Sequence, residues 1–199
     1  MLADRTKTIL RVCEHIAAKD FEIAKQVVEA EYPFVSIRKT SRNYTPLLMT
    51  EIFIRDGFID RYRGTRLVFP PVLRLLSHYL PDVFPFHKNG KMSEGHIAYW
   101  ELFPTIDHVV PVARGGADTM DNWVCCSMLT NSIKSNWTLD QLQWEIHGRG
   151  DFKVWDGMIR WFQRQVSEDP QLSNSPYIKK WNSAATKAIA KNSLHPEFE

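Results

Sequence analysis

Apolar residues near the N-terminus recur at helical spacing in two successive segments. Residues three or four positions apart lie on one face of a helix, and an aspartate often begins a helix as its N-cap. Asp20 lies between the two segments. Residues 1–44 are therefore predicted to form an amphipathic helical hairpin followed by a basic linker. The apolar positions are Ile9, Cys13, Ile16 and Ala17 in the first segment and Ile23, Ala24, Val27 and Val28 in the second.

The other predicted helices begin mainly at threonine or proline. A threonine side chain caps the free N–H groups of a first turn, and proline has no N–H to lose there. Short apolar runs around Asp107 and after Asn122 predict two strands. The fold class is therefore predicted as α+β, a mostly helical protein around a small strand-containing core. The predicted helices cover residues 45–55, 72–79, 138–146, 154–167 and 176–190, and residues 81–95 are a predicted loop.

The composition fits one or two compact domains. The chain has 199 residues, 44% apolar and 24% charged, which excludes fibrous and disordered classes. No apolar stretch reaches the roughly 18 to 20 residues that span a bilayer, and no secretory pattern begins the chain. We therefore expect a cytoplasmic protein without a membrane partner. Cys13, Cys125 and Cys126 include no C-x-x-C pair, so we expect reduced thiols.

Positive charge is concentrated in residues 36–74. This segment holds eight basic residues against three acidic ones, although the whole chain is nearly balanced at a formal +2. Such clustering is typical of a protein that binds a phosphate backbone. A solvated face with local ion pairs explains it equally well. The residues predicted to contact nucleic acid are Arg38, Lys39, Arg42, Arg114 and Lys134.

Residues 105–136, TIDHVVPVARGGADTMDNWVCCSMLTNSIKSN, carry the candidate chemistry. Asp107 and Asn131 offer a carboxylate and an amide oxygen, ligands that suit Mg²⁺ or Mn²⁺ better than zinc. His108 can take a proton from an attacking water, and Lys134 can pair with a phosphate. Neighbours on a strand point to opposite faces, so Asp107 and His108 can serve one site only where the strand ends or bulges.

This segment resembles the HNH nuclease family, whose ββα-metal fold cleaves phosphodiester bonds with one divalent cation. The matching elements are Asp107-His108, the Val-Pro-x-x-x-Gly-Gly run ending at Gly116, Asn122, and Asn131-x-x-Lys134. The resemblance implies that Asp107 and Asn131 hold Mg²⁺ or Mn²⁺ and that His108 is the general base. It also implies that Asn122 fixes the loop that orients His108. The third signature residue is asparagine, so the motif is of the H-N-N kind.

The sequence departs from zinc-stapled members of that family. Residues 55–64 resemble the stretch that carries their first cysteine pair, but Asp60 and Arg63 stand at the cysteine positions. Ser127 and Thr130 replace the second pair. We therefore expect no structural zinc, and an Asp60–Arg63 ion pair in its place. Cys125 and Cys126 are interpreted as small apolar strand residues, because adjacent cysteines do not easily ligate one tetrahedral ion.

The resemblance divides the chain into three parts. Residues 45–150 are the predicted nuclease core, with an insertion at about 65–104, and residues 151–199 are predicted helices packed on that core. His87 and His96 lie in the insertion. Either could assist the leaving oxygen as a cationic group, and otherwise they are loop or substrate-rim residues.

We expect the substrate to be DNA, double-stranded in the first instance, and the flanking helices would allow a homodimer that cuts both strands. A catalytically silent module that keeps the fold and binds nucleic acid or a partner is the main alternative. A third interpretation treats Asp107, His108 and the asparagines as ordinary turn and cap residues. It fits each residue singly but not their joint spacing.

Overall fold

The computed structural model describes residues 4–34 and 44–194. The chain divides into two compact units, residues 1–41 and residues 42–199, which are described separately. None of the helices in the described ranges combines the length and apolar character needed to cross a membrane.

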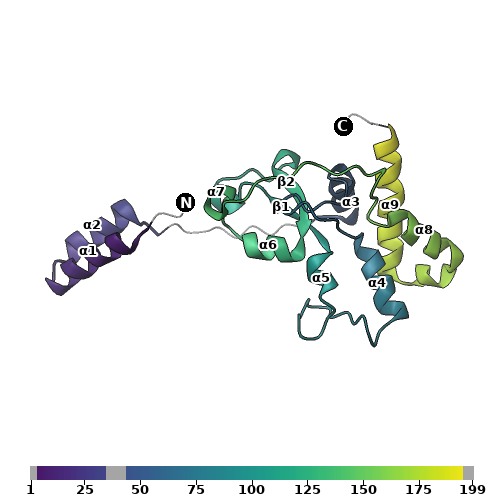
Figure 1. Ribbon diagram of the computed structural model, residues 1–199, viewed down its shortest axis with the longest axis horizontal. Helices are drawn as coiled ribbons and strands as arrows, with labels where there is room; N and C mark the ends of the chain where they lie inside the picture. Colours follow the sequence, from purple (N-terminus) through teal and green to yellow (C-terminus); the bar gives the residue numbers. More distant parts are fainter. Residues whose placement is uncertain (1–3, 35–43, 195–199) are drawn as a thin grey trace. The chain divides into compact units, whose positions relative to one another are not determined.

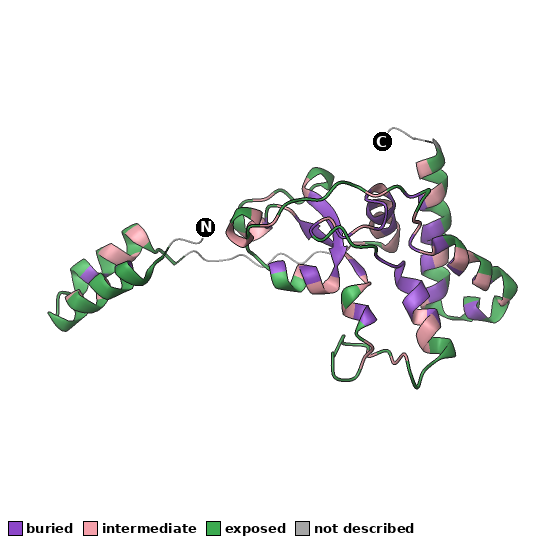
Figure 2. Ribbon diagram, viewed as in Figure 1, coloured by how far each residue is buried: buried purple, intermediate pink, exposed green. Residues whose placement is uncertain are grey.

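The first unit is the predicted helical hairpin, formed by α1 (Thr6–Ala17) and α2 (Phe21–Glu31). Its ends are joined through Glu31, which forms an ion pair with Arg11 and accepts a hydrogen bond from Thr8. Asp20 precedes α2 as predicted, although its side chain makes no capping hydrogen bond. Within this hairpin only Thr8 and Ala24 are buried, so most apolar side chains of both helices are exposed (Figure 2).

The second unit is built around a core of helices. α3 (Pro46–Arg55) lies along α9 (Pro176–Leu194), and α4 (Pro70–Tyr79) and α8 (Ile159–Glu168) pack beside them (Figure 1). Thr45 accepts a hydrogen bond from the N–H of Leu48, the cap that the sequence predicts for α3. The C-terminal helices therefore share one hydrophobic core with the segment that precedes the sheet. Its most deeply buried large side chains include Phe53, Phe58, Phe69, Phe162 and Ile159.

The sheet has two antiparallel strands, β1 (Pro104–His108) and β2 (Trp123–Ser127), which pair in register from Pro104–Ser127 to His108–Trp123. α6 (Met128–Lys134) follows β2 directly and packs on both strands (Figure 1). The short helices are α5 (Ala98–Glu101), α7 (Leu139–Leu142) and the 3-10 turns at Val112–Arg114, Met120–Asn122 and Pro170–Asn174. Helices and a small antiparallel sheet thus form an α+β protein, as predicted.

Several predicted helix boundaries are wrong. The helix expected over 138–146 ends at Leu142, because Gln143 adopts a left-handed conformation (φ 57°). The helix expected from 154 begins only at Ile159, after Gly157 with φ 63°. A Cβ at Gly157 would lie 2.4 Å from the ring of Phe58, so this turn is fixed by a close contact that the local sequence does not reveal. α9 runs four residues past the predicted end, to Leu194.

Candidate functional site

Asp107 and His108 are the last two residues of β1 and lie on opposite faces of the sheet. In the strand register they oppose Val124 and Trp123. Because the strand ends at His108, both side chains lie at the same end of the sheet. A strand end at this position is the condition under which the sequence predicts that Asp107 and His108 can serve one site.

Asp107 is held by two buried donors. The Tyr62 hydroxyl lies 2.7 Å and Lys134 Nζ 2.8 Å from Asp107 Oδ2. Burial, reinforced by the negative charge of Asp107, raises the pKa of Tyr62, so the phenol stays protonated and donates. In the described part of the chain no hydrogen bond reaches Oδ1, and the Asp107 side chain keeps 10% of its surface exposed. One carboxylate oxygen therefore remains available to a cation.

Asn131 lies on the same face of the sheet as Asp107. Its Nδ2 donates to Thr105 Oγ1 at 3.0 Å and to the Ile106 carbonyl at 3.4 Å. Thr105 is two residues before Asp107, so both side chains point to the face that α6 covers. Because Nδ2 is the atom that contacts β1, Oδ1 is the Asn131 atom that would hold a cation. The structure thus brings the two predicted metal ligands to one face.

Lys134 does not have the phosphate-binding position that the sequence predicts. Its side chain is fully buried, and Nζ donates to the His108 carbonyl at 2.7 Å as well as pairing with Asp107. A buried ammonium in this position cannot reach a DNA backbone. Lys134 instead joins α6 to the end of β1 and balances the charge of Asp107.

His108 is buried, with 4% of its surface exposed, and its Nε2 is covered by an acidic residue. Asp118 Oδ1 lies 2.7 Å from His108 Nε2 and accepts from it when this nitrogen carries a proton, and the indole N–H of Trp123 donates to the same carboxylate oxygen at 2.9 Å. The hydrogen bonds from His108 and Trp123 lower the pKa of Asp118, so this carboxylate is ionised at neutral pH. Tyr44 OH also lies 3.3 Å from Asp118 Oδ1. Sequence reasoning missed Asp118, which has no place in the motif.

Asn122 ties together the two ends of the loop after His108. Its Oδ1 accepts from the Val110 N–H at 2.9 Å, and its Nδ2 donates to the carbonyls of Val110 and Ala117 at 2.9 and 2.8 Å. Gly116 is required for this approach, because a Cβ there would lie 1.8 Å from the Val110 carbonyl oxygen. The Gly-Gly and Asn elements of the motif therefore serve one compact loop.

Replacing Asn122 with alanine removes these three hydrogen bonds and leaves backbone groups without a partner. The free energy of unfolding is expected to fall by about 1–3 kcal/mol. Urea denaturation followed by circular dichroism measures it. Asn136→Ala is the matched control, because Asn136 is exposed. Equal stability of the two variants would show that Asn122 does not hold the loop.

The predicted Asp60–Arg63 ion pair is not formed. Asp60 is fully buried and its carboxylate accepts from the N–H groups of Tyr62 and Ser127, each at 3.0 Å, whereas Arg63 is exposed. Ser127 Oγ lies 2.8 Å from Thr130 Oγ1. Three of the four positions at which zinc-stapled proteins carry cysteine are thus linked by hydrogen bonds. Backbone N–H groups satisfy the carboxylate, which is why it needs no arginine.

A second buried carboxylate, Asp56, was not predicted as a structural centre. Its Oδ1 contacts Arg55 at 2.9 Å, Arg61 at 3.2 Å and Arg149 at 3.5 Å. Its Oδ2 accepts from the Cys125 N–H at 2.8 Å, which joins α3 to the middle of β2. Three guanidinium groups around one carboxylate leave excess positive charge. Burial and the neighbouring Arg55 lower the pKa of Arg149 accordingly, against the opposing effect of Asp56.

Cys125 and Cys126 pack as apolar residues of β2, as interpreted from the sequence. Both are fully buried, one on each face of the sheet. Burial raises the pKa of each thiol well above its usual range. Both therefore stay protonated, the form that does not ligate zinc.

His87 and His96 are not brought to the end of β1 where Asp107 and His108 lie. His87 Nε2 contacts Glu94 at 3.3 Å, and His96 stacks on Phe84 at 4.0 Å between ring centroids. These contacts are local to the loop that precedes α5, so a role at the leaving oxygen is not supported. Arg114 is exposed, whereas Arg38, Lys39 and Arg42 lie outside the described residues.

The donor set fits a hard divalent cation better than zinc. Among the described residues no group of three histidine, cysteine or acidic side chains could hold a metal ion. Asp107 and Asn131 supply one carboxylate and one amide oxygen, and Mg²⁺ commonly binds through one or two such groups, with water and phosphate completing its shell. These residues therefore suit a cation held jointly with substrate.

Comparison of the chain with protein-family models, curated proteins and solved structures gives no match.

Proposed function

We propose that this chain is a metal-dependent endonuclease of the HNH type that hydrolyses phosphodiester bonds in DNA. The observation that carries the proposal is the arrangement at the end of the sheet. Asp107 and Asn131 lie on the face covered by α6, and His108 lies on the other face beside the loop fixed by Asn122. The proposal assigns one site to a carboxylate, an amide oxygen and an imidazole from positions up to 24 residues apart in the sequence.

Asp107 and Asn131 would hold Mg²⁺ or Mn²⁺, which supplies charge neutralisation at a phosphate. Tyr62 and Lys134 fix the Asp107 carboxylate through Oδ2 and leave Oδ1 toward the cation. His108 would take the proton of the attacking water at Nε2. Because Asp118 now lies 2.7 Å from this nitrogen, the Asp118 side chain has to withdraw before water reaches it. Asp118 is 49% exposed, so its displacement leaves no buried charge behind.

The arginine cluster around Asp56 is a candidate contact for the DNA backbone. A cavity of about 370 Å³ is lined by Arg55, Arg61 and Arg149 together with Asp121, Val109 and Trp123. Val109 directly follows His108, so the cluster borders the candidate catalytic end of the sheet. Guanidinium groups bind phosphate oxygens in a bidentate manner. Arg149, whose side chain is 43% exposed, is the member of this cluster that would contact a phosphate in place of Lys134, while Arg55 and Arg61 stay paired with Asp56.

A catalytically silent nucleic-acid-binding or interaction module is the second candidate. It is favoured by the two contacts that occupy the site groups, Lys134 on Asp107 and Asp118 on His108. An anionic carboxylate over the imidazole also repels a phosphate. The two candidates differ in whether bound DNA is cut when Mg²⁺ or Mn²⁺ is present.

Nicking of supercoiled plasmid in Mg²⁺ or Mn²⁺ tests the proposal. The wild-type protein is expected to convert supercoiled to open-circular DNA, and chelation of the metal is expected to stop it. Asn131→Ala is expected to abolish the metal-stimulated cleavage, because it removes one of two protein ligands but no buried charge.

Asn174→Ala is the matched control, since Asn174 is exposed at the end of the 3-10 turn Pro170–Asn174. DNA that is bound but never nicked by the wild-type protein would reject the nuclease and favour the silent module. Cleavage by Asn131→Ala at the wild-type rate would remove Asn131 from the site.

A further inference from the structure

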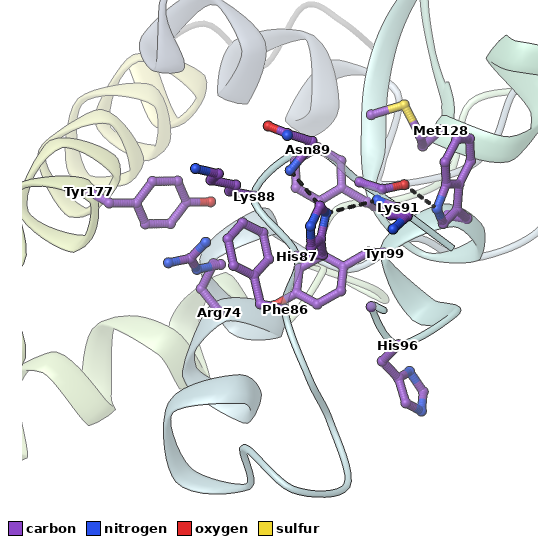
Figure 3. Close-up of a pocket in the computed structure, with 14 residues that line it drawn as sticks. Arg74, Phe86, His87, Lys88, Asn89, Lys91, His96, Tyr99, Met128 and Tyr177 are labelled. Atoms are coloured by element: carbon purple, nitrogen blue, oxygen red, sulfur yellow. Dashed lines mark hydrogen bonds between the residues drawn. The ribbon is translucent and has the colours of Figure 1, made fainter. Parts of the chain in front are cut away.

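A second cavity, separate from the end of β1, lies between α4, the loop before α5 and α9 (Figure 3). Its volume is about 460 Å³, within the usual range of small-molecule sites. Phe103 and Met128 line it on the sheet side; these residues adjoin the start of β1 and of α6. The cavity is therefore at the opposite end of β1 from Asp107 and His108, and its occupation does not depend on the proposed nuclease activity.

Arg74 is one of the basic residues that line this cavity. It projects from α4 with its guanidinium 3.5 Å from the centre of the Phe86 ring and 5.2 Å from that of Tyr177. Figure 3 shows these three side chains clustered at one side of the cavity. Within residues 4–34 and 44–194 Arg74 forms no ion pair and no hydrogen bond. Its ring contacts fix the guanidinium plane and leave its five N–H donors for an anion.

The charges around the cavity are not balanced. Lys91 and His87 both contact Glu94, so one carboxylate is shared between them. Arg74 and Lys88 have no acidic partner in the described ranges, and no acidic residue lines the cavity. Burial raises the pKa of Tyr99 and of Tyr177, so neither phenol contributes negative charge. The cavity thus favours an anionic ligand.

Several of the remaining lining residues are aromatic, and two of them are held by hydrogen bonds. Tyr99 OH donates to the Leu73 carbonyl at 2.8 Å, and the Trp100 indole N–H donates to the Gly90 carbonyl at 3.1 Å. Phe86 lies against Tyr99 with ring centroids 5.2 Å apart. Aromatic side chains fixed in this way offer flat apolar surfaces on which a planar ring can stack, a contact worth about 1–3 kcal/mol per base in nucleic-acid-binding proteins.

We propose that this cavity binds one nucleotide, with its base against the aromatic walls and its phosphate at Arg74 and Lys88. The base and the phosphate together account for both features of the lining, the fixed aromatic surfaces and the unbalanced cations. The volume suits a single nucleotide and is too small for a duplex. The nucleotide is either free or an unpaired residue of a nucleic-acid strand, since both present the same chemistry.

Titration of the full chain with thymidine 5′-phosphate and adenosine 5′-phosphate tests this proposal, followed by the indole N–H signal of Trp100 in NMR spectra. Saturable binding that shifts this signal is expected. Thymidine without its phosphate and inorganic phosphate alone are each expected to bind at least about tenfold more weakly, since each loses one set of contacts. An oligothymidylate strand of eight residues distinguishes a free nucleotide from an unpaired residue of a strand as the natural ligand. Tighter binding of the strand than of the mononucleotide indicates a strand, and weaker binding indicates a free nucleotide.

Arg74→Gln is expected to weaken nucleotide binding by about tenfold or more, because it removes a charge-assisted contact while keeping a polar side chain. Arg164→Gln is the matched control, as Arg164 is exposed on α8. Lys88→Gln, on the exposed loop, gives a second variant that does not disturb the core. Absence of saturable binding by either nucleotide, equal binding of inorganic phosphate, or unchanged affinity in both the Arg74 and Lys88 variants would overturn the proposal.

Discussion

Replacing His108 with alanine is expected to slow metal-dependent plasmid cleavage by about 10²–10⁴-fold, the usual contribution of a general base. The proposed reaction needs a group that takes the proton from water, and the only imidazole at the end of β1 within the described chain is that of His108. Binding of DNA is expected to change little, because the proposed backbone contacts are made by arginine side chains and not by His108. Single-turnover nicking, with binding measured separately by gel shift, resolves the two effects.

His78→Ala provides the matched control, since His78 is exposed in the last turn of α4 and has no part in the proposed site. His108→Ala also removes the contacts to Asp118 and Trp123, so its thermal unfolding is compared with that of the wild-type protein. A folded His108→Ala protein that nicks DNA at the undiminished rate excludes His108 as the general base.

Replacing Asp56 with alanine is expected to lower the free energy of unfolding by about 3–5 kcal/mol, as happens when one partner of a buried ion pair is removed. Asp56 is fully buried, and its loss leaves the guanidinium groups of Arg55 and Arg61 close together without a counter-charge. The N–H of Cys125 also loses its acceptor. Urea denaturation measures the change, because urea does not screen charge as an ionic denaturant does.

Asp82→Ala serves as the control for Asp56, because it removes the same charge from an exposed position after α4. A loss of less than about 1 kcal/mol in Asp56→Ala would place this carboxylate among surface ion pairs and contradict its role in joining α3 to β2.

Local sequence signals predicted the helices well where the start is marked. Thr45-Pro46 begins α3 and Pro176 begins α9, because capping and the missing N–H of proline act within one turn. The ends were predicted less well. α7 stops early at a left-handed Gln143, and the start of α8 is set by the contact of Gly157 with Phe58, about 100 residues away.

For the candidate site, too, the sequence predicted some features and missed others. The motif predicted Asp107, His108, Asn122 and Asn131 as a group; in the structure Asp107 and His108 end β1, Asn122 holds the loop after His108, and Asn131 on α6 contacts Thr105 and Ile106 of β1. The motif did not reveal the partners that hold them. Tyr62 reaches Asp107 across 45 residues of sequence, and Asp118 covers His108 from a loop with no helical or strand periodicity.

By itself the sequence determined which residues carry groups suited to catalysis or metal binding and which short segments form helices and strands, since both depend on spacing along the chain. Only the tertiary structure decided where charge is buried. It placed Lys134 against Asp107, gave Asp60 two backbone N–H groups instead of Arg63, and gathered three arginines around Asp56. A buried charge takes whichever partner the packed chain brings within hydrogen-bond distance, and that distance is set by the fold rather than by sequence separation.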